Sequence, residues 1–215
     1  MKITIWSDFM GPFCYIGETH LKKALEDFEH NDQVEIEYKS FLLSPDAKHD
    51  PNKDYYETFA EMKGISIEQA RQMFQNVVNM AENAGIVIDY DTAKFASTIP
   101  AHHIFQYAKE LGKGNEFFER FYKAHFEEGE LISDAVTLGK LSEEIGLDQS
   151  AALQSTQKEE YTQRINRDIQ EAAQIGVQGV PFYVFNNKYA VSGAQPVESF
   201  TQVLEQVWEE ENEEN

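Results

Sequence analysis

The sequence predicts an α/β domain whose sheet is built from both ends of the chain and whose middle is helical. Residues 2–7 and 34–39 alternate apolar and polar side chains, which is typical of half-buried strands. Residues 182–192 contain two short aromatic and β-branched runs joined by an Asn-Asn-Lys turn, a pattern that indicates a hairpin. Between about residues 50 and 175 the apolar periodicity is helical almost throughout. The order β-α-β, many helices, β-β-α therefore predicts one sheet domain interrupted by an all-helical insertion.

The individual helices follow from their end signals and apolar faces. Pro12 fits the first turn of a helix at little cost, and the next residues place an apolar face at Leu21, Ala24, Leu25 and Phe28. A later helix is expected to end at Gly176, a residue type that favours helix C-termini. The last helix is expected to run from about Pro196 to Trp208, and the acidic residues 209–215 to form a frayed, solvated tail.

These elements predict a discontinuous α/β domain formed by residues 1–48 and 158–215, with a helical insertion at residues 49–157. The 38 acidic and 18 basic residues give a net charge of -20, which argues against binding to nucleic acid or to an anionic membrane surface. No apolar run approaches the roughly 18 residues that a membrane span needs. The N-terminus has no signal-peptide pattern and the chain has a single cysteine, so we expect a cytoplasmic protein.

Cys14 is the first candidate for chemistry, because any thiol reaction must use this one sulfur. It follows a strand and a tight turn and lies in the first turn of the expected helix. The helix dipole and free backbone N–H groups there favour a thiolate. The alternative is that Cys14 is a small buried apolar residue. Asp8, near the same turn, is either a proton acceptor for a buried thiol or a turn-forming acid.

A second candidate segment is Gly-Val-Gln-Gly-Val-Pro-Phe at residues 176–182. Pro181 stands just before an expected strand and follows two glycines, which indicates a rigid turn. The isomer of the Val180–Pro181 bond is left open by the sequence.

These two segments together resemble the DsbA-like thioredoxin family, and most closely its cytoplasmic FrnE-type branch. The resemblance is carried by Xaa-Pro-Xaa-Cys at residues 11–14, by residues 171–182 and 188–196, and by shorter matches at Ala101-His102 and residues 144–148. It covers essentially the whole chain. It implies a thioredoxin-like fold interrupted by the helical insertion, and a thiol–disulfide oxidoreductase or disulfide isomerase that acts on protein or peptide thiols and disulfides.

The chain departs from that family at the position of its nucleophilic cysteine, where it has Gly11. Because exchange proceeds by attack of a second thiolate, a dithiol–disulfide cycle is excluded within one chain. Monothiol chemistry at Cys14 remains, as a mixed disulfide with glutathione or with a substrate protein, or as a disulfide with a second chain. In the family reading Pro181 is a cis-proline of the catalytic site, and it presents the backbone of Val180 to an extended substrate. Gly11, Pro12 and Phe13 would complete the binding surface.

Two other functions stay open. One is a non-redox, chaperone-like or adaptor module that binds through the cis-proline surface. The other is a glutathione-dependent enzyme of the kappa-class transferase or hydroxychromene-carboxylate isomerase type. The key serine of those enzymes would align with Gly11, which has no hydroxyl. We expect no resident cofactor, with glutathione entering only as a substrate. We also expect no metal, because the adjacent His102 and His103 point about 100° apart on a helix.

Overall fold

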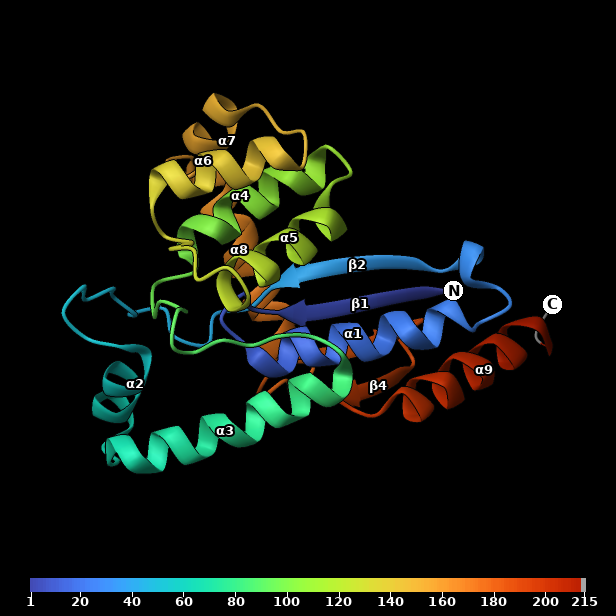
Figure 1. Ribbon diagram of the computed structural model, residues 1–215. Coiled ribbons are helices and arrows are strands. Elements are labelled where there is room, and N and C mark those ends of the chain that lie inside the picture. The colour runs from blue at the N-terminus through green and yellow to red at the C-terminus, as the bar shows by residue number, and fades with distance from the viewer. Residues whose placement is uncertain (214–215) are drawn as a thin grey trace.

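The computed structural model describes residues 1–213 and contains a four-stranded mixed sheet with helices packed on both faces (Figure 1). The strand order is β2-β1-β3-β4, with β1 parallel to β2, β1 antiparallel to β3 and β3 antiparallel to β4. The strands are β1 (Lys2–Ser7), β2 (Glu35–Ser40), β3 (Phe182–Phe185) and β4 (Tyr189–Ser192). The predicted α/β fold class is therefore confirmed.

The helices of the described chain are α1 (Pro12–Glu26), α2 (Tyr55–Lys63), α3 (Ile67–Ala84), α4 (Ile99–Glu110), α5 (Gly114–Phe126), α6 (Ala135–Glu144), α7 (Gln149–Ser155), α8 (Glu159–Gln174) and α9 (Val197–Glu213), with a 3-10 turn at Asn31–Gln33. Local sequence fixes many of their ends. Asp54 and Ser66 form capping boxes at the starts of α2 and α3, and Gly64 and Gly85 end these helices in the left-handed conformation. None of the described helices is long and apolar enough to cross a membrane.

The period-two pattern of β1 divides the core between the two faces of the sheet. Ile3 and Ile5 are buried in the same cluster as Phe200 of α9. Trp6 points to the other face, where it packs with Ala172 of α8 and its Nε1 donates a hydrogen bond to a carbonyl of that helix, Asp168 O, at 2.9 Å. Figure 1 shows α9 and α3 below the strands and the helices α4 to α7 above them. Both ends of the chain are thus held on the sheet.

Phe9, two residues after the end of β1, anchors the helical segment to the sheet. It is fully buried, and its ring stacks on Phe118 of α5 with centroids 4.4 Å apart. Phe105 of α4 and Phe117 of α5 also contact it edge-on, at 6.4 and 5.6 Å. Aromatic pairs of this kind add about 0.5–1.5 kcal/mol beyond the area that they bury. The turn that follows β1 is consequently clamped between the strand and these two helices.

The expected tail is wrong for residues 209–213, because α9 continues to Glu213; residues 214–215 lie outside the described residues. The physical reason is a set of polar contacts with the β3–β4 turn. Glu210 accepts hydrogen bonds from Lys188 Nζ and Tyr189 Oη, each at 2.5 Å. Asn186 Nδ2 donates to Glu211 at 3.0 Å. These tertiary contacts hold the acidic end of α9 in place. The composition of the segment alone does not reveal them.

Candidate active-site turn

The turn between β1 and α1 is held by backbone hydrogen bonds. Gly11 N–H donates to Asp8 O and Cys14 N–H donates to Gly11 O, each at 3.0 Å. Gly11 is the N-cap of α1 in an extended conformation and provides no side-chain cap. Pro12 is the first helical residue, as expected from its fixed φ angle and missing N–H. Cys14 therefore lies in the first turn of α1, where the sequence places it.

The sulfur of Cys14 faces the interior beside Gly11. A Cβ added to Gly11 would lie only 2.6 Å from Cys14 Sγ, which means that the sulfur occupies the space a side chain at position 11 would need. Only 1 % of Cys14 is exposed. The side chain missing at position 11 therefore leaves no open path to the sulfur, because the sulfur itself fills that place.

Burial raises the pKa of the Cys14 thiol to about 12. Hydrogen bonds from the Ser7 side chain and the Asp8 backbone act in the opposite direction, while the charges of Asp8 and Glu18 raise the pKa further. Of the two interpretations that the sequence leaves open for Cys14, the structure favours the small buried residue over the activated thiolate. Desolvation of the charged form outweighs the helix dipole at this depth. At neutral pH the group is a thiol.

Beneath the turn, Asp8 belongs to a buried cluster of hydrogen bonds. Neither Asp8 nor His102 is exposed, and His102 Nε2 lies 3.2 Å from Asp8 Oδ1. The second carboxyl oxygen of Asp8 accepts the backbone N–H of Leu43 at 2.7 Å. His102 Nδ1 lies 3.1 Å from Ser40 Oγ. Through His102, these contacts join Asp8 after β1, Ser40 at the end of β2, and α4. Asp8 therefore helps to hold the turn in place.

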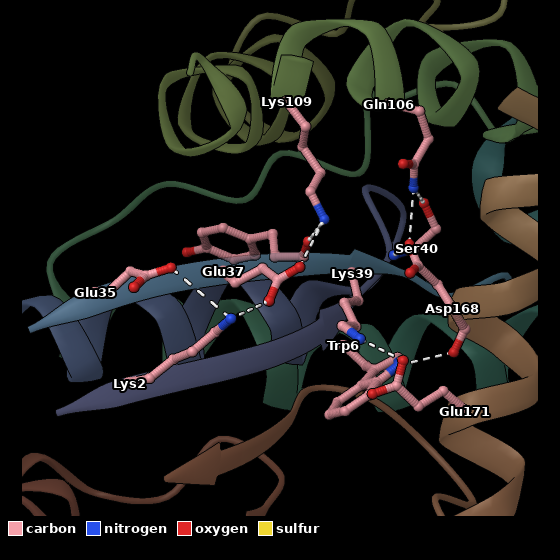
Figure 2. A network of polar contacts seen from close by, with 11 residues as sticks. Lys2, Trp6, Glu35, Glu37, Lys39, Ser40, Gln106, Lys109, Asp168 and Glu171 are labelled. Atoms are coloured by element: carbon pink, nitrogen blue, oxygen red, sulfur yellow. Dashed lines mark hydrogen bonds and ion pairs between the residues drawn. The ribbon is translucent and has the colours of Figure 1, made fainter. Parts of the chain in front are cut away.

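The cluster continues from Ser40 to α8, as Figure 2 shows. Gln106 of α4 donates through Nε2 to Ser40 Oγ at 2.9 Å and to Asp168 Oδ2 at 2.8 Å. The same Asp168 oxygen accepts the backbone N–H of Ser40 at 2.9 Å. Burial raises the pKa of Asp168, against the lowering effect of these hydrogen bonds and of nearby lysines. We call the five side chains Asp8, Ser40, His102, Gln106 and Asp168 the Asp8 network.

The second candidate segment lies against α1 one turn beyond Cys14. A Cβ added to Gly17 would lie 3.1 Å from Pro181 Cγ and 2.4 Å from Tyr183 Oη. Glycine at position 17 thus permits the close approach of α1 to the start of β3. The Val180–Pro181 peptide bond is cis. Pro181 is buried and Val180 is half-buried. The structure therefore brings α1 and the start of β3, which are far apart in the sequence, into contact at this point.

The other predicted site residues lie on the rim of the turn. Pro12 is half-buried and Phe13 is 41 % exposed, and both line an apolar groove. Within residues 1–213 no group of three or more His, Cys, Asp or Glu side chains could hold a metal ion.

Sequence reasoning missed the roles of Gly17 and of the Asp8 network. For Gly17 the available signal was a glycine one helical turn after Cys14. For the Asp8 network there was no local signal, because its members are spread from position 8 to position 168.

Comparisons with known proteins agree with this architecture. The model of the family described as DSBA-like thioredoxin domain matches residues 2–205. A structure described as a probable DsbA oxidoreductase of Streptomyces coelicolor is 34% identical, with 98% of this chain and 91% of that chain covered and a TM-score of 0.89. The protein YwbO of Bacillus subtilis is 29% identical over 95% of this chain and 96% of its own length.

A more distant structure, the cytosolic disulfide reductase DsbM of Pseudomonas aeruginosa with GSH, is similar in fold. It is 16% identical and has a TM-score of 0.69, over 96% of this chain and 98% of that chain. The family match, which spans nearly all of the sequence, decides the classification. The chain belongs to the family of DSBA-like thioredoxin domains.

Proposed function

We propose that this chain is a dithiol-free member of the cytoplasmic FrnE-type branch, which binds an extended polypeptide segment beside the Cys14 turn and does not turn over disulfides. The observation that carries the proposal is the burial of the only sulfur in the chain, with a pKa of about 12. The family supplies the scaffold of a thiol–disulfide oxidoreductase. What this chain retains of that scaffold is its binding surface.

Both routes to disulfide chemistry fail at Cys14. A dithiol cycle needs a second thiolate to resolve the mixed disulfide, and the chain has none. A monothiol route, with glutathione or with a protein disulfide, needs an exposed thiolate that can attack a sulfur. Cys14 meets neither requirement. A glutathione-activating role also lacks support, since Gly11 carries no hydroxyl.

The binding role is supported by free backbone groups at Val180. Among residues 1–213, neither the N–H nor the C=O of Val180 has a hydrogen-bond partner. The next carbonyl, that of Pro181, is already used, because it accepts the N–H of Gly193 at 2.8 Å. An extended polypeptide that pairs with Val180 would satisfy both groups in the manner of an added strand. The chemical class bound is thus an unfolded or extended polypeptide.

The proposal is tested by titrating a fluorescently labelled, permanently unfolded polypeptide without cysteine and following its anisotropy. We expect Cys14→Ser to bind it as the wild type does, since the sulfur takes no part. Val180→Pro removes one N–H and should weaken binding about tenfold. That factor corresponds to the loss of one backbone hydrogen bond and of part of the packing against the bound polypeptide.

Val180→Ala is the matched control, because it shortens the same side chain and keeps the N–H; we expect binding within about threefold of wild type. Circular dichroism of each variant checks that the fold is intact. Loss of binding in Cys14→Ser, or equal binding by Val180→Pro and Val180→Ala in folded proteins, would overturn the proposal.

A further inference from the structure

A groove of about 440 Å³ lies between the start of α1, α2 and α3, and we call it the methionine groove. Four of the five methionines of the chain line it, namely Met10, Met62, Met73 and Met80. Aromatic rings from α1, α2 and α3 complete the wall, including Phe13, Phe59 and Phe74. Methionine is flexible and polarizable, and it is over-used at surfaces that adapt to varied apolar ligands.

The groove leaves large apolar side chains in contact with solvent. Met73 is 52 % exposed, and Met62 and Met80 are 45 and 41 % exposed. Scattered exposed apolar residues need no explanation, but several that converge on one cavity mark a binding site. The volume lies within the range of about 300–1,000 Å³ that is usual for small-molecule pockets.

Among the residues that the structure describes, Lys63 is the only charged one that lines the groove, although the chain has more than twice as many acidic as basic residues. It is exposed and forms the last residue of α2. Its Nζ lies 5.9 Å from the centre of the Phe59 ring, and it has no ion pair within residues 1–213. The acid two residues before it, Glu61, is already paired with Lys53. An available cation therefore stands at the edge of an apolar cavity.

We propose that the methionine groove binds an elongated apolar molecule with one anionic group, such as a medium-chain aliphatic carboxylate. The apolar body would lie among the methionine and phenylalanine side chains, and the carboxylate would pair with Lys63. An extended polypeptide is disfavoured there, because Ser44, Tyr55 and Asn76 are the few uncharged polar side chains that could pair with its backbone groups in a mostly apolar wall. Pro12 and Phe13, which belong to the expected polypeptide-binding surface, also line the groove, whereas Val180 does not, so polypeptide binding at Val180 is measured separately.

Isothermal titration of the full chain with decanoate, below its micelle concentration, and with decanol tests the proposal. We expect saturable one-to-one binding of decanoate and weaker binding of decanol. Lys63→Glu should weaken decanoate about fivefold and abolish its advantage over decanol, which is the size of effect expected for an exposed ion pair. Lys123→Glu, the same charge change on α5 outside the groove, should leave binding within about twofold.

Met73→Asp places a charge in the apolar wall and should weaken decanoate at least about tenfold. Its control is Val136→Asp, because Val136 is an exposed apolar residue of α6 that does not line the groove. Absence of saturable decanoate binding would overturn the inference. Wild-type affinity in both Lys63→Glu and Met73→Asp would do so as well. Neither result would bear on polypeptide binding at Val180, which is measured separately.

Discussion

The Gly11→Cys variant is expected to catalyse disulfide exchange at least about 100-fold faster than the wild-type chain, whose rate should equal the uncatalysed one. The substitution places a second sulfur at the N-cap of α1, where free N–H groups and the helix dipole favour a thiolate. Its Cβ would start 2.6 Å from Cys14 Sγ, which is too close for an unstrained contact, so the buried sulfur must shift. The two sulfurs are then neighbours, as a dithiol–disulfide cycle requires. Reduction of insulin by dithiothreitol measures the rate.

Two variants separate the effect of the sulfur from that of crowding. Gly11→Ala adds the same Cβ next to Cys14 without a thiol, and we expect it to remain inactive. Gly11→Cys combined with Cys14→Ser keeps a thiol at position 11 but cannot resolve a mixed disulfide, so it should accumulate that adduct and not turn over. Equal activity of the wild type and Gly11→Cys would show that the site lies elsewhere.

The second large effect is expected from Asp8→Ala, which should lower the free energy of unfolding by about 3–4 kcal/mol. Removal of the carboxyl leaves the partly buried N–H of Leu43 and the buried Nε2 of His102 without their partner. It also opens a small cavity beneath the turn. Urea denaturation followed by tryptophan fluorescence measures the change, read as a shift of the midpoint at constant slope.

Asp8→Asn is the conservative comparison, and we expect a smaller loss of about 1–2 kcal/mol because its amide oxygen can still accept from Leu43. Asp46→Ala serves as the surface control. Asp46 is exposed and has no side-chain partner within residues 1–213, so the change should stay within about 0.5 kcal/mol. A loss for Asp8→Ala no larger than for Asp46→Ala would mean that the Asp8 network does not stabilise the turn.

The sequence predicted those parts of the fold that depend on local patterns. Period-two alternation located β1, and the paired asparagines located the β3–β4 turn, where Asn186 and Asn187 both have positive φ angles. The end of α9 was missed because Glu210 is held by residues about 20 positions away in the chain. Local composition cannot report a tertiary anchor of this kind.

The candidate site divides in the same way. The spacing of Gly11, Pro12 and Cys14 was enough to place the cysteine in the first turn of α1. The depth of its sulfur was not predictable, because it depends on packing by segments far away in the sequence. The contact between Asp8 and His102 was not predictable either, because the two residues are 94 positions apart. Taken alone, neither residue indicates that it has a distant partner.

The most direct test of the redox-inert thiol is the rate at which iodoacetamide alkylates the native chain, read by intact mass. A rise in pKa from 9.0 to about 12 means about 1,000-fold less thiolate at pH 7.5, before any loss of access. We expect native protein to remain unmodified over a period in which urea-unfolded protein reacts fully, with the native rate still rising above pH 9. Alkylation of native Cys14 at the rate of the unfolded chain at pH 7.5 would contradict the account.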